Sequence, residues 1–287
     1  MQIEWIETFL DLLDTRSFNK SAERLNITQS TVSARINALE TEIGKKLFSR
    51  SRAGTNLTAA GIAFEPHARG LRHSWSEAVR AIRATGNVDV SIRIGLQTDL
   101  ASTHIGDWVA QFQTLFPRAE FYVELDYSNQ MCNDLLAGNL DFAVLYTPKF
   151  MPDLHFETVG RINLRMISTV ARSLDQIDAD RYIGANYAPA FDRQHQQQLP
   201  HLSNTRLSCG QNSAVAGIIS TMGGTAYVLE ETAQSLLNQG IAKLVVDAPV
   251  LYQDVYAAFH MRHRHSLTHQ RLRDAVNAHF RPKYTLA

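Results

Sequence analysis

Residues 18–50 constrain the fold more than any other part of this chain. An apolar residue recurs there at i, i+4 and i+7, a spacing that predicts a short amphipathic helix through Phe18, Ala22 and Leu25. Thr28 follows a two-residue turn and can cap a second helix, because its hydroxyl accepts a free amide of the first turn. The second helix has an apolar stripe of its own, formed by Val32, Ile36, Leu39 and Ile43. A preceding helix with apolar Ile6, Phe9, Leu10 and Leu13 is expected to pack behind these two.

The other face of the second helix is short, polar and rich in hydrogen-bond donors. Its residues are Gln29, Ser30, Thr31, Ser33, Arg35 and Asn37. Such a face suits the major groove of DNA, where base edges and phosphates both need hydrogen-bond partners. The pattern therefore predicts a helix-turn-helix that binds double-stranded DNA.

A basic hairpin is expected directly after this helix. Gly44 can end the helix in a left-handed conformation, and Leu47 with Phe48 would anchor the hairpin. Its tip is predicted at residues 52–56, where Gly54 and Asn56 tolerate positive φ. This would be a wing, whose Arg50 and Arg52 are expected to enter a minor groove or touch phosphates.

The first 60 or so residues resemble the N-terminal signature of LysR-type transcriptional regulators. The matching positions are 22, 25, 28–33, 36, 39–40, 43–44, 47–48, 50, 57–58 and 60–61. The resemblance implies a winged helix-turn-helix, a long dimerising linker helix, and a C-terminal two-lobed α/β effector domain of the periplasmic-binding-protein type (type 2). It also implies paired recognition helices in successive major grooves, and a tetramer, formed by joining two dimers, that bends promoter DNA.

Composition is compatible with such a protein. A chain of 287 residues accommodates two or three compact units, and its apolar fraction of 45% and charged fraction of 20% are ordinary for globular proteins. No apolar run reaches the ~18 residues of a membrane span, and Glu4, Glu7 and Asp11 stand where a signal peptide would be apolar. Two cysteines far apart give no disulfide framework. We expect a cytoplasmic protein.

Charge is distributed unevenly although the net charge is zero. Residues 1–86 hold twelve Lys and Arg against nine Asp and Glu, and the remainder holds sixteen against nineteen. Four of the cations, Lys45, Lys46, Arg50 and Arg52, fall within eight residues that contain no acid. This patch is a reasonable phosphate-contact surface, although a merely solvated charge run is the alternative.

These patterns divide the chain into three segments, 1–58, 59–87 and 88–287. Residues 1–58 form the DNA-binding domain, and 59–87 form a linker helix with Leu71, Trp75, Ala78, Val79 and Ile82 on one side. This stripe predicts a homodimer, with packing on its own domain as the alternative. Pro66 interrupts the helical pattern at a cost of about 3 kcal/mol unless the helix bends.

Residues 88–287 alternate between strand and helix, which predicts parallel sheets with crossover helices. Lobe I is expected at 88–160 and 255–287, and lobe II at 161–254. The expected elements are strands at 90–94, 121–125, 141–146, 164–169, 181–183, 226–229 and 255–259 and helices at 102–115, 129–137, 214–221 and 267–280.

A small-molecule effector is expected between the two lobes, at strand ends and helix N-termini. The candidate contacts are Gln97, Thr98, Asp99, Ser102, Ser128, Asn186, Tyr187, Gln211 and Asn212. The family's effector-contact positions map by resemblance onto Asp99 and Ser128, and Asp99 departs from the small hydroxyl residue common there. If Asp99 contacts the effector, that effector should be neutral or cationic; the alternative is a helix cap that faces solvent.

Other function classes fit less well. The sequence has no nucleophile elbow, phosphate loop or paired metal motif, so an enzyme is not expected, nor is a cofactor. A metal site among His260, His263, His265 and His269 is disfavoured by the interspersed arginines, and a solvated surface is preferred. Cys132 lacks the basic surroundings of a redox sensor. A ligand-free DNA-binding repressor and a solute-binding receptor remain as alternatives.

Overall fold

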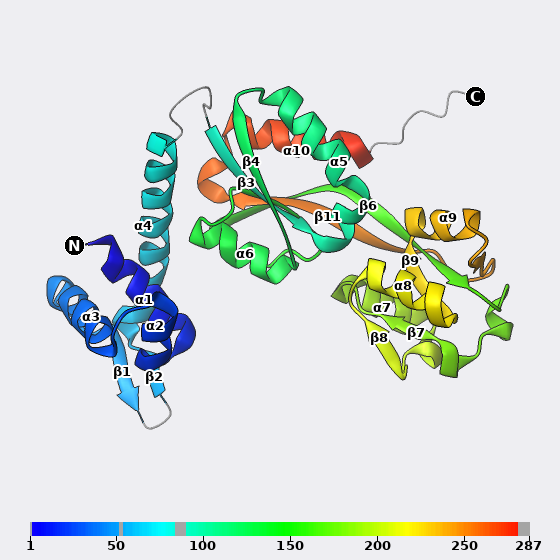
Figure 1. Ribbon diagram of the computed structural model, residues 1–287, viewed down its shortest axis with the longest axis horizontal. Coiled ribbons are helices and arrows are strands. Elements are labelled where there is room, and N and C mark those ends of the chain that lie inside the picture. The colour runs from blue at the N-terminus through cyan, green and yellow to red at the C-terminus, as the bar shows by residue number, and fades with distance from the viewer. Residues whose placement is uncertain (1, 52–53, 84–89, 281–287) are drawn as a thin grey trace. The chain divides into compact units, whose positions relative to one another are not determined.

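The computed structural model describes residues 2–51, 54–83 and 90–280 (Figure 1). The chain divides into two compact units, one made of residues 1–91 and 136–139 and the other of residues 92–135 and 140–287. Among the described residues, none of the helices combines the length and apolar character needed to cross a bilayer.

The first unit is a winged helix-turn-helix followed by a long helix. Its elements are α1 (Ile3–Thr15), α2 (Phe18–Leu25), α3 (Gln29–Ile43), β1 (Phe48–Ser51), β2 (Gly54–Leu57) and α4 (Ala59–Arg83). The core is built from Ile6, Phe9, Leu10, Leu12, Ile36, Leu39 and Leu47. Leu12 is buried and Leu13 only half-buried, and Ile43 is 39% exposed, so the expected inward positions of Leu13 and Ile43 are wrong.

Local chemistry explains where these helices begin and end. Ser17 caps α2 by accepting the Lys20 amide, and Thr28 caps α3 by accepting the Thr31 amide, as predicted. Asn26 and Gly44 end the two helices in the left-handed region, with φ of 52° and 75°. These four positions fix the turn between α2 and α3 and the exit from α3.

The wing differs from its prediction at the tip. β1 and β2 pair antiparallel with Ser51 opposite Gly54, so Gly54 and Asn56 are strand residues rather than tip residues. Asn56 does not adopt positive φ. Arg52, the residue expected at the tip, lies outside the described residues.

Helix α4 packs against α1 near its start. Phe64 packs edge-on against Phe9 of α1, with ring centroids 5.1 Å apart, and Ala68 is fully buried. Pro66 lies within the helix, which continues past it to Arg83. The apolar residues farther along are exposed, Leu71 by 40%, Trp75 by 52% and Ile82 by 74%.

The second unit has nine strands and six α-helices in its described part. The strands are β3 (Val90–Gln97), β4 (Ala119–Asp126), β5 (Phe142–Leu145), β6 (Leu154–Ser168), β7 (Ile183–Ala185), β8 (Leu207–Cys209), β9 (Thr225–Leu229), β10 (Lys243–Leu244) and the long return strand β11 (Leu251–His260), where β3 begins just before the unit. The helices are α5 (Thr98–Leu115), α6 (Ser128–Ala137), α7 (Pro189–Gln198), α8 (Asn212–Met222), α9 (Glu230–Asn238) and α10 (Leu267–Phe280). Short 3-10 turns lie at Leu174–Gln176, Ala179–Arg181, Pro200–Leu202 and Met261–His263.

A seven-stranded mixed sheet runs through this unit, beside a two-stranded parallel sheet of β7 and β8, so the expectation of purely parallel sheets is wrong. Its order is β10-β6-β11-β5-β3-β4, with β9 also paired to β6. β3 and β5 are parallel, as expected, but β11 is antiparallel to both β5 and β6. The predicted lobe boundaries at 160/161 and 254/255 fall inside β6 and β11, where a register shift between Val255 and Tyr256 interrupts the ladder.

Several predicted boundaries shift as a consequence. The segment at 164–169 is only the end of β6, and Arg181 belongs to a 3-10 turn. β3 continues through Gln97, and α5 begins at Thr98 instead of Ser102. Thr98 and Asp99 therefore lie in the first turn of a helix that follows directly from a buried strand.

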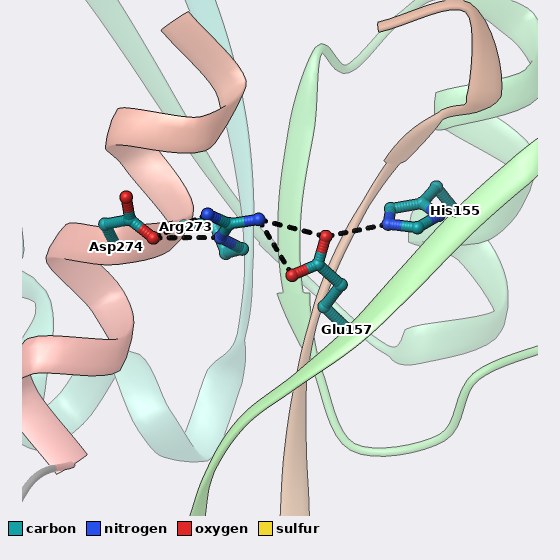
Figure 2. Close-up of polar contacts among 4 residues, drawn as sticks. All are labelled: His155, Glu157, Arg273 and Asp274. Carbon is teal, nitrogen blue, oxygen red and sulfur yellow. Dashed lines mark hydrogen bonds and ion pairs between the residues drawn. The ribbon is translucent and has the colours of Figure 1, made fainter. Parts of the chain in front are cut away.

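The C-terminal helix α10 lies beside α5 on one face of the sheet, and α6 lies on the other face (Figure 1). Figure 2 shows how α10 is attached to β6: Arg273 donates two hydrogen bonds to the Glu157 carboxylate, at 2.9 and 3.1 Å, and also binds Asp274. The Nε2 atom of His155 lies 2.8 Å from Oε1 of Glu157 and extends this polar network. Gly160 on β6 leaves room for the Phe280 ring, which a Cβ at that position would meet.

Candidate DNA-binding surface and effector site

The N-terminal half of α3 presents the predicted polar face. Gln29, Ser30 and Asn37 are exposed, and Thr31, Ser33 and Arg35 are half-buried. Gln29 Nε2 donates to Ser33 Oγ at 3.4 Å, so these two side chains lie together along the exposed edge of the helix. Thr28 accepts the Thr31 amide, and its hydroxyl also lies 2.8 Å from the hydroxyls of Ser30 and Thr31, so the cap engages both of these side chains.

Arg35 is oriented by α1. Its Nη1 atom donates to Thr8 Oγ1 at 3.3 Å, and Thr8 in turn donates to the Glu4 carbonyl oxygen at 2.6 Å. Thr8 is fully buried. The hydrogen bond to Thr8 therefore restrains the Arg35 guanidinium where it extends from α3. The apolar stripe of the first helix did not predict a buried polar residue such as Thr8.

Glu40 connects α3 to the wing. Its carboxylate accepts the amides of Leu47 and Phe48 at 2.8 and 3.2 Å and the Lys46 ammonium at 2.6 Å. Burial raises the pKa of Glu40, but these three donors outweigh it and the pKa lies below its ordinary value. Lys46, expected as a phosphate contact, is therefore engaged with Glu40, and Arg50 lies in β1 opposite Thr55.

In the second unit, Gln97 and Ser128 meet at the ends of β3 and β4. Ser128 Oγ donates to Gln97 Oε1 at 2.9 Å and accepts the amides of Tyr146 and Thr147 at 3.2 and 3.1 Å. Both side chains are buried. The hydroxyl of Ser128 is thus occupied in holding the end of β5, which favours a positioning role.

Asp99 and Asn212 join the two predicted lobes. Asp99 Oδ1 accepts the backbone amide of Asn212, the first residue of α8, at 2.8 Å. Asn212 is held in turn, since its side chain accepts the Leu229 amide and donates to Thr232 Oγ1, both at 2.8 Å. Asp99 is only 3% exposed, so it is not a cap that faces solvent. Burial raises its pKa to about 6, partly offset by the Asn212 amide.

Of the remaining candidates, Asn186 is the one that lies at a different cavity. Gln211 Nε2 donates to the Tyr127 hydroxyl at 3.1 Å, a second link between the lobes. Thr98 is half-buried, and the exposed Ser102 donates back to the Asp99 carbonyl oxygen. Tyr187 is buried and donates to the Tyr227 carbonyl oxygen at 2.8 Å. Asn186 instead lines a separate polar cavity of about 610 Å³ in lobe II.

Two residues at this site were missed by the sequence patterns. Tyr146 and Gln253 are buried, and Gln253 Nε2 donates to the carbonyl oxygens of Tyr146 and Asp254, each at 2.9 Å. Within the part of the chain that the structure describes, the Tyr146 hydroxyl and Gln253 Oε1 have no hydrogen-bond partner. A buried polar residue in the middle of an apolar strand was the available signal for Gln253.

The histidine-rich segment is not a uniformly solvated surface. His269 is buried between Ser266 and the Asp141 carbonyl oxygen, and the His263 ring stacks on it with centroids 4.5 Å apart. The described residues contain no group of three His, Cys, Asp or Glu side chains arranged to hold a metal ion. Cys132 is buried, and burial raises the pKa of its thiol.

Comparison with known proteins agrees with this architecture. Residues 3–62 match the model of the bacterial regulatory helix-turn-helix protein, lysR family, and residues 86–281 match the LysR substrate binding domain. The HTH-type transcriptional regulator HdfR of Yersinia enterocolitica is 27% identical over 271 residues, covering 90% of each chain. HdfR of Yersinia pestis is 26% identical over 272 residues, with the same coverage.

Solved structures share the fold along the whole chain. ArgP from Mycobacterium tuberculosis superposes with a TM-score of 0.62 at 21% identity, covering 98% of this chain and 97% of ArgP. LysG from Corynebacterium glutamicum with bound effector Arg gives 0.59 at 21% identity and covers 97% of each chain. CbnR complexed with its target DNA gives 0.62 at 15% identity, covering 97% and 99%. Two family models that together span nearly all of the sequence, on a fold with this DNA-facing helix and this two-lobed unit, show that the chain belongs to the LysR family of DNA-binding transcriptional regulators with a C-terminal effector-binding domain.

Proposed function

We propose that this regulator reads its operator with the exposed edge of α3 and that it binds DNA as a homodimer, or as a tetramer of two such dimers. The supporting observation is the polar N-terminal half of α3, where Gln29 and Ser33 lie together and Thr8 orients Arg35. CbnR, whose structure contains its target DNA, is a precedent for DNA binding by a protein of this fold. Lys45, Arg50 and Arg52 serve as phosphate contacts in this proposal.

We further propose that the regulatory signal is a small molecule bound between the lobes, beside Asp99, Gln211 and Asn212. These residues already connect lobe I to lobe II through two hydrogen bonds. A ligand that binds one spacing of the lobes better than another would shift the equilibrium between them. Asp99 requires that ligand to be neutral or cationic, and LysG with its effector Arg is a precedent for a cation. Such a regulator would work in the cytoplasm, beside the chromosome.

The DNA-binding proposal is tested with an operator selected from random duplexes by the full-length protein. Gln29→Ala and Ser33→Ala should each weaken binding to the selected duplex by about 1–3 kcal/mol, because base-edge contacts are lost, and should affect a scrambled duplex much less. Glu23→Ala, an exposed substitution on α2, is the matched control. Equal losses of affinity for both duplexes would show that these residues contact only the DNA backbone.

The phosphate contacts have a different signature. Arg50→Gln and Arg52→Gln should weaken binding to both duplexes alike and reduce the slope of log affinity against log salt by about one unit each. An unchanged salt slope would remove both arginines from the interface.

A further inference from the structure

Asp99 is a buried carboxylate whose charge is poorly compensated. Within the described part of the chain its side chain meets one hydrogen-bond donor, the Asn212 amide. Glu40 is 6% exposed against 3% for Asp99, but it accepts two amides and an ammonium. The pKa of Glu40 is lowered because these donors outweigh its burial, and the pKa of Asp99 is raised because its deeper burial outweighs the single amide. The interlobe site therefore lacks a positive charge.

An anionic ligand is excluded by the same contact. The N-terminus of α8 offers free amides and a favourable dipole, which would attract a carboxylate from solution. Asp99 already occupies the Asn212 amide there and is itself in the first turn of α5. A second carboxylate beside it would add like charge in a buried environment.

Two more buried polar atoms, one on Tyr146 and one on Gln253, have no hydrogen-bond partner among the described residues. The Gln253 amide nitrogen faces two carbonyl oxygens, so its orientation is fixed and Oε1, an acceptor, is the atom left without a partner. The Tyr146 hydroxyl, also buried and unpartnered, interacts electrostatically with Asp99. Unpartnered buried polar atoms are rare in native proteins because each costs about 1–3 kcal/mol.

An ammonium group would compensate the charge of Asp99, avoid the repulsion that an anion would meet, and donate to the two unpartnered acceptors. It carries a positive charge and three N–H donors and has no acceptor that needs a partner. Asp99 supplies the counter-charge, and Gln253 Oε1 and the Tyr146 oxygen supply acceptors. We infer that the effector of this regulator is an organic amine, whose ammonium group binds Asp99, Gln253 and Tyr146 between the lobes. This inference rests on the interlobe ligand of the proposed function.

Three four-carbon probes that differ in charge test the inference on the full-length protein. Thermal unfolding is followed at pH 8 and constant ionic strength with 1,4-diaminobutane, 1,4-butanediol or succinate. The diamine should raise the midpoint saturably, the diol little, and succinate not at all. Asp99→Asn, which keeps the size of the side chain, should weaken the diamine by tenfold or more. Asp107→Asn, an exposed substitution on the same helix, should leave it unchanged.

A second variant reverses the preference. Asp99→Ala frees the Asn212 amide, so succinate should now stabilise the protein while the diamine loses its effect. Equal stabilisation by the diamine in wild type and Asp99→Asn, no saturable stabilisation of the wild type, or stabilisation of the wild type by succinate would each overturn the inference. Operator affinity of the same proteins, measured without any probe, separates this failure from that of the proposed function, because binding through α3 is then tested in the absence of an effector.

Discussion

At the scale of single residues, burial alone does not decide what a carboxylate does in this protein. Glu40 and Asp99 are both removed from water, but the donors around them differ in number and charge. Glu40 is stabilised in its ionised form and ties α3 to the wing. Asp99 is disfavoured in its ionised form and joins two lobes through one amide. A perturbed group of the second kind is typical of a functional site, where stability is given up for binding.

The stability effect of Asp99 has a definite sign. Its folded pKa of about 6 lies above the ordinary value of 3.8, so the folded state holds the proton more tightly than the unfolded state. Stability from this group is complete below about pH 4 and is lost as the pH rises through about 6. Asp99→Asn should therefore raise the free energy of unfolding at pH 8 by about 3 kcal/mol at most, and not at pH 4. Chemical denaturation across this pH range, with Asp107→Asn as control, measures the effect; a gain independent of pH would assign it to something other than ionisation.

Thr8 provides a second prediction at this scale. Because its hydroxyl is the acceptor that orients Arg35, Thr8→Val should weaken binding to the selected operator severalfold although Thr8 is buried. Thr8→Ser keeps the acceptor and should retain affinity. DNA-binding titrations compare the two variants, and urea denaturation confirms that both are folded. Unchanged affinity in folded Thr8→Val would show that Arg35 does not depend on α1.

At the scale of elements, the contact between α3 and the wing is the one most open to test. Glu40→Ala leaves the buried amides of Leu47 and Phe48 without an acceptor, which should lower the stability of the DNA-binding unit by about 1–3 kcal/mol. The pKa of Glu40 is lowered, so its contribution is present above the ordinary value of 4.5 and is lost as the pH falls through the lower folded value. Calorimetry of wild type, Glu40→Ala and the control Glu23→Ala checks this. A destabilisation that persists unchanged at acid pH would contradict it.

Element boundaries were predictable where one face of a helix is apolar. The predicted span of α10 is the observed one, Leu267–Phe280, and α3 begins directly after its predicted cap. The long strands β6 and β11 were seen only in part, because Glu157, Arg161 and Asp254 along them are polar and their pairing is between distant segments. Antiparallel pairing of this kind leaves no local signal, since partner residues lie far apart in sequence.

At the scale of the whole molecule, the position of the candidate effector residues near the lobe boundary was easier to predict than their contacts. Gln97, Asp99, Ser128 and Asn212 were all expected near the interlobe region, because strand ends and helix N-termini can be located from the sequence. Their partners were not: Asp99 and Asn212 are 113 residues apart, and Gln253 enters from a strand that returns late in the chain. Asn186 was expected with them but lines another cavity.

Assembly is the last consequence of the fold that the structure makes testable. Leu71, Trp75 and Ile82 are exposed on α4 and recur at the spacing of one helix face, which is the arrangement of a helix that packs against its own copy. Trp75→Glu should yield monomers in sedimentation, because a charge would be buried in the interface. Operator affinity should fall with it, because one recognition helix per molecule cannot bridge two half-sites. Ser76→Glu, about 100° around α4 from Trp75 and outside the stripe of Leu71, Trp75 and Ile82, is the control and should remain dimeric. A Trp75→Glu protein that still sediments as a dimer would place the interface elsewhere in the molecule.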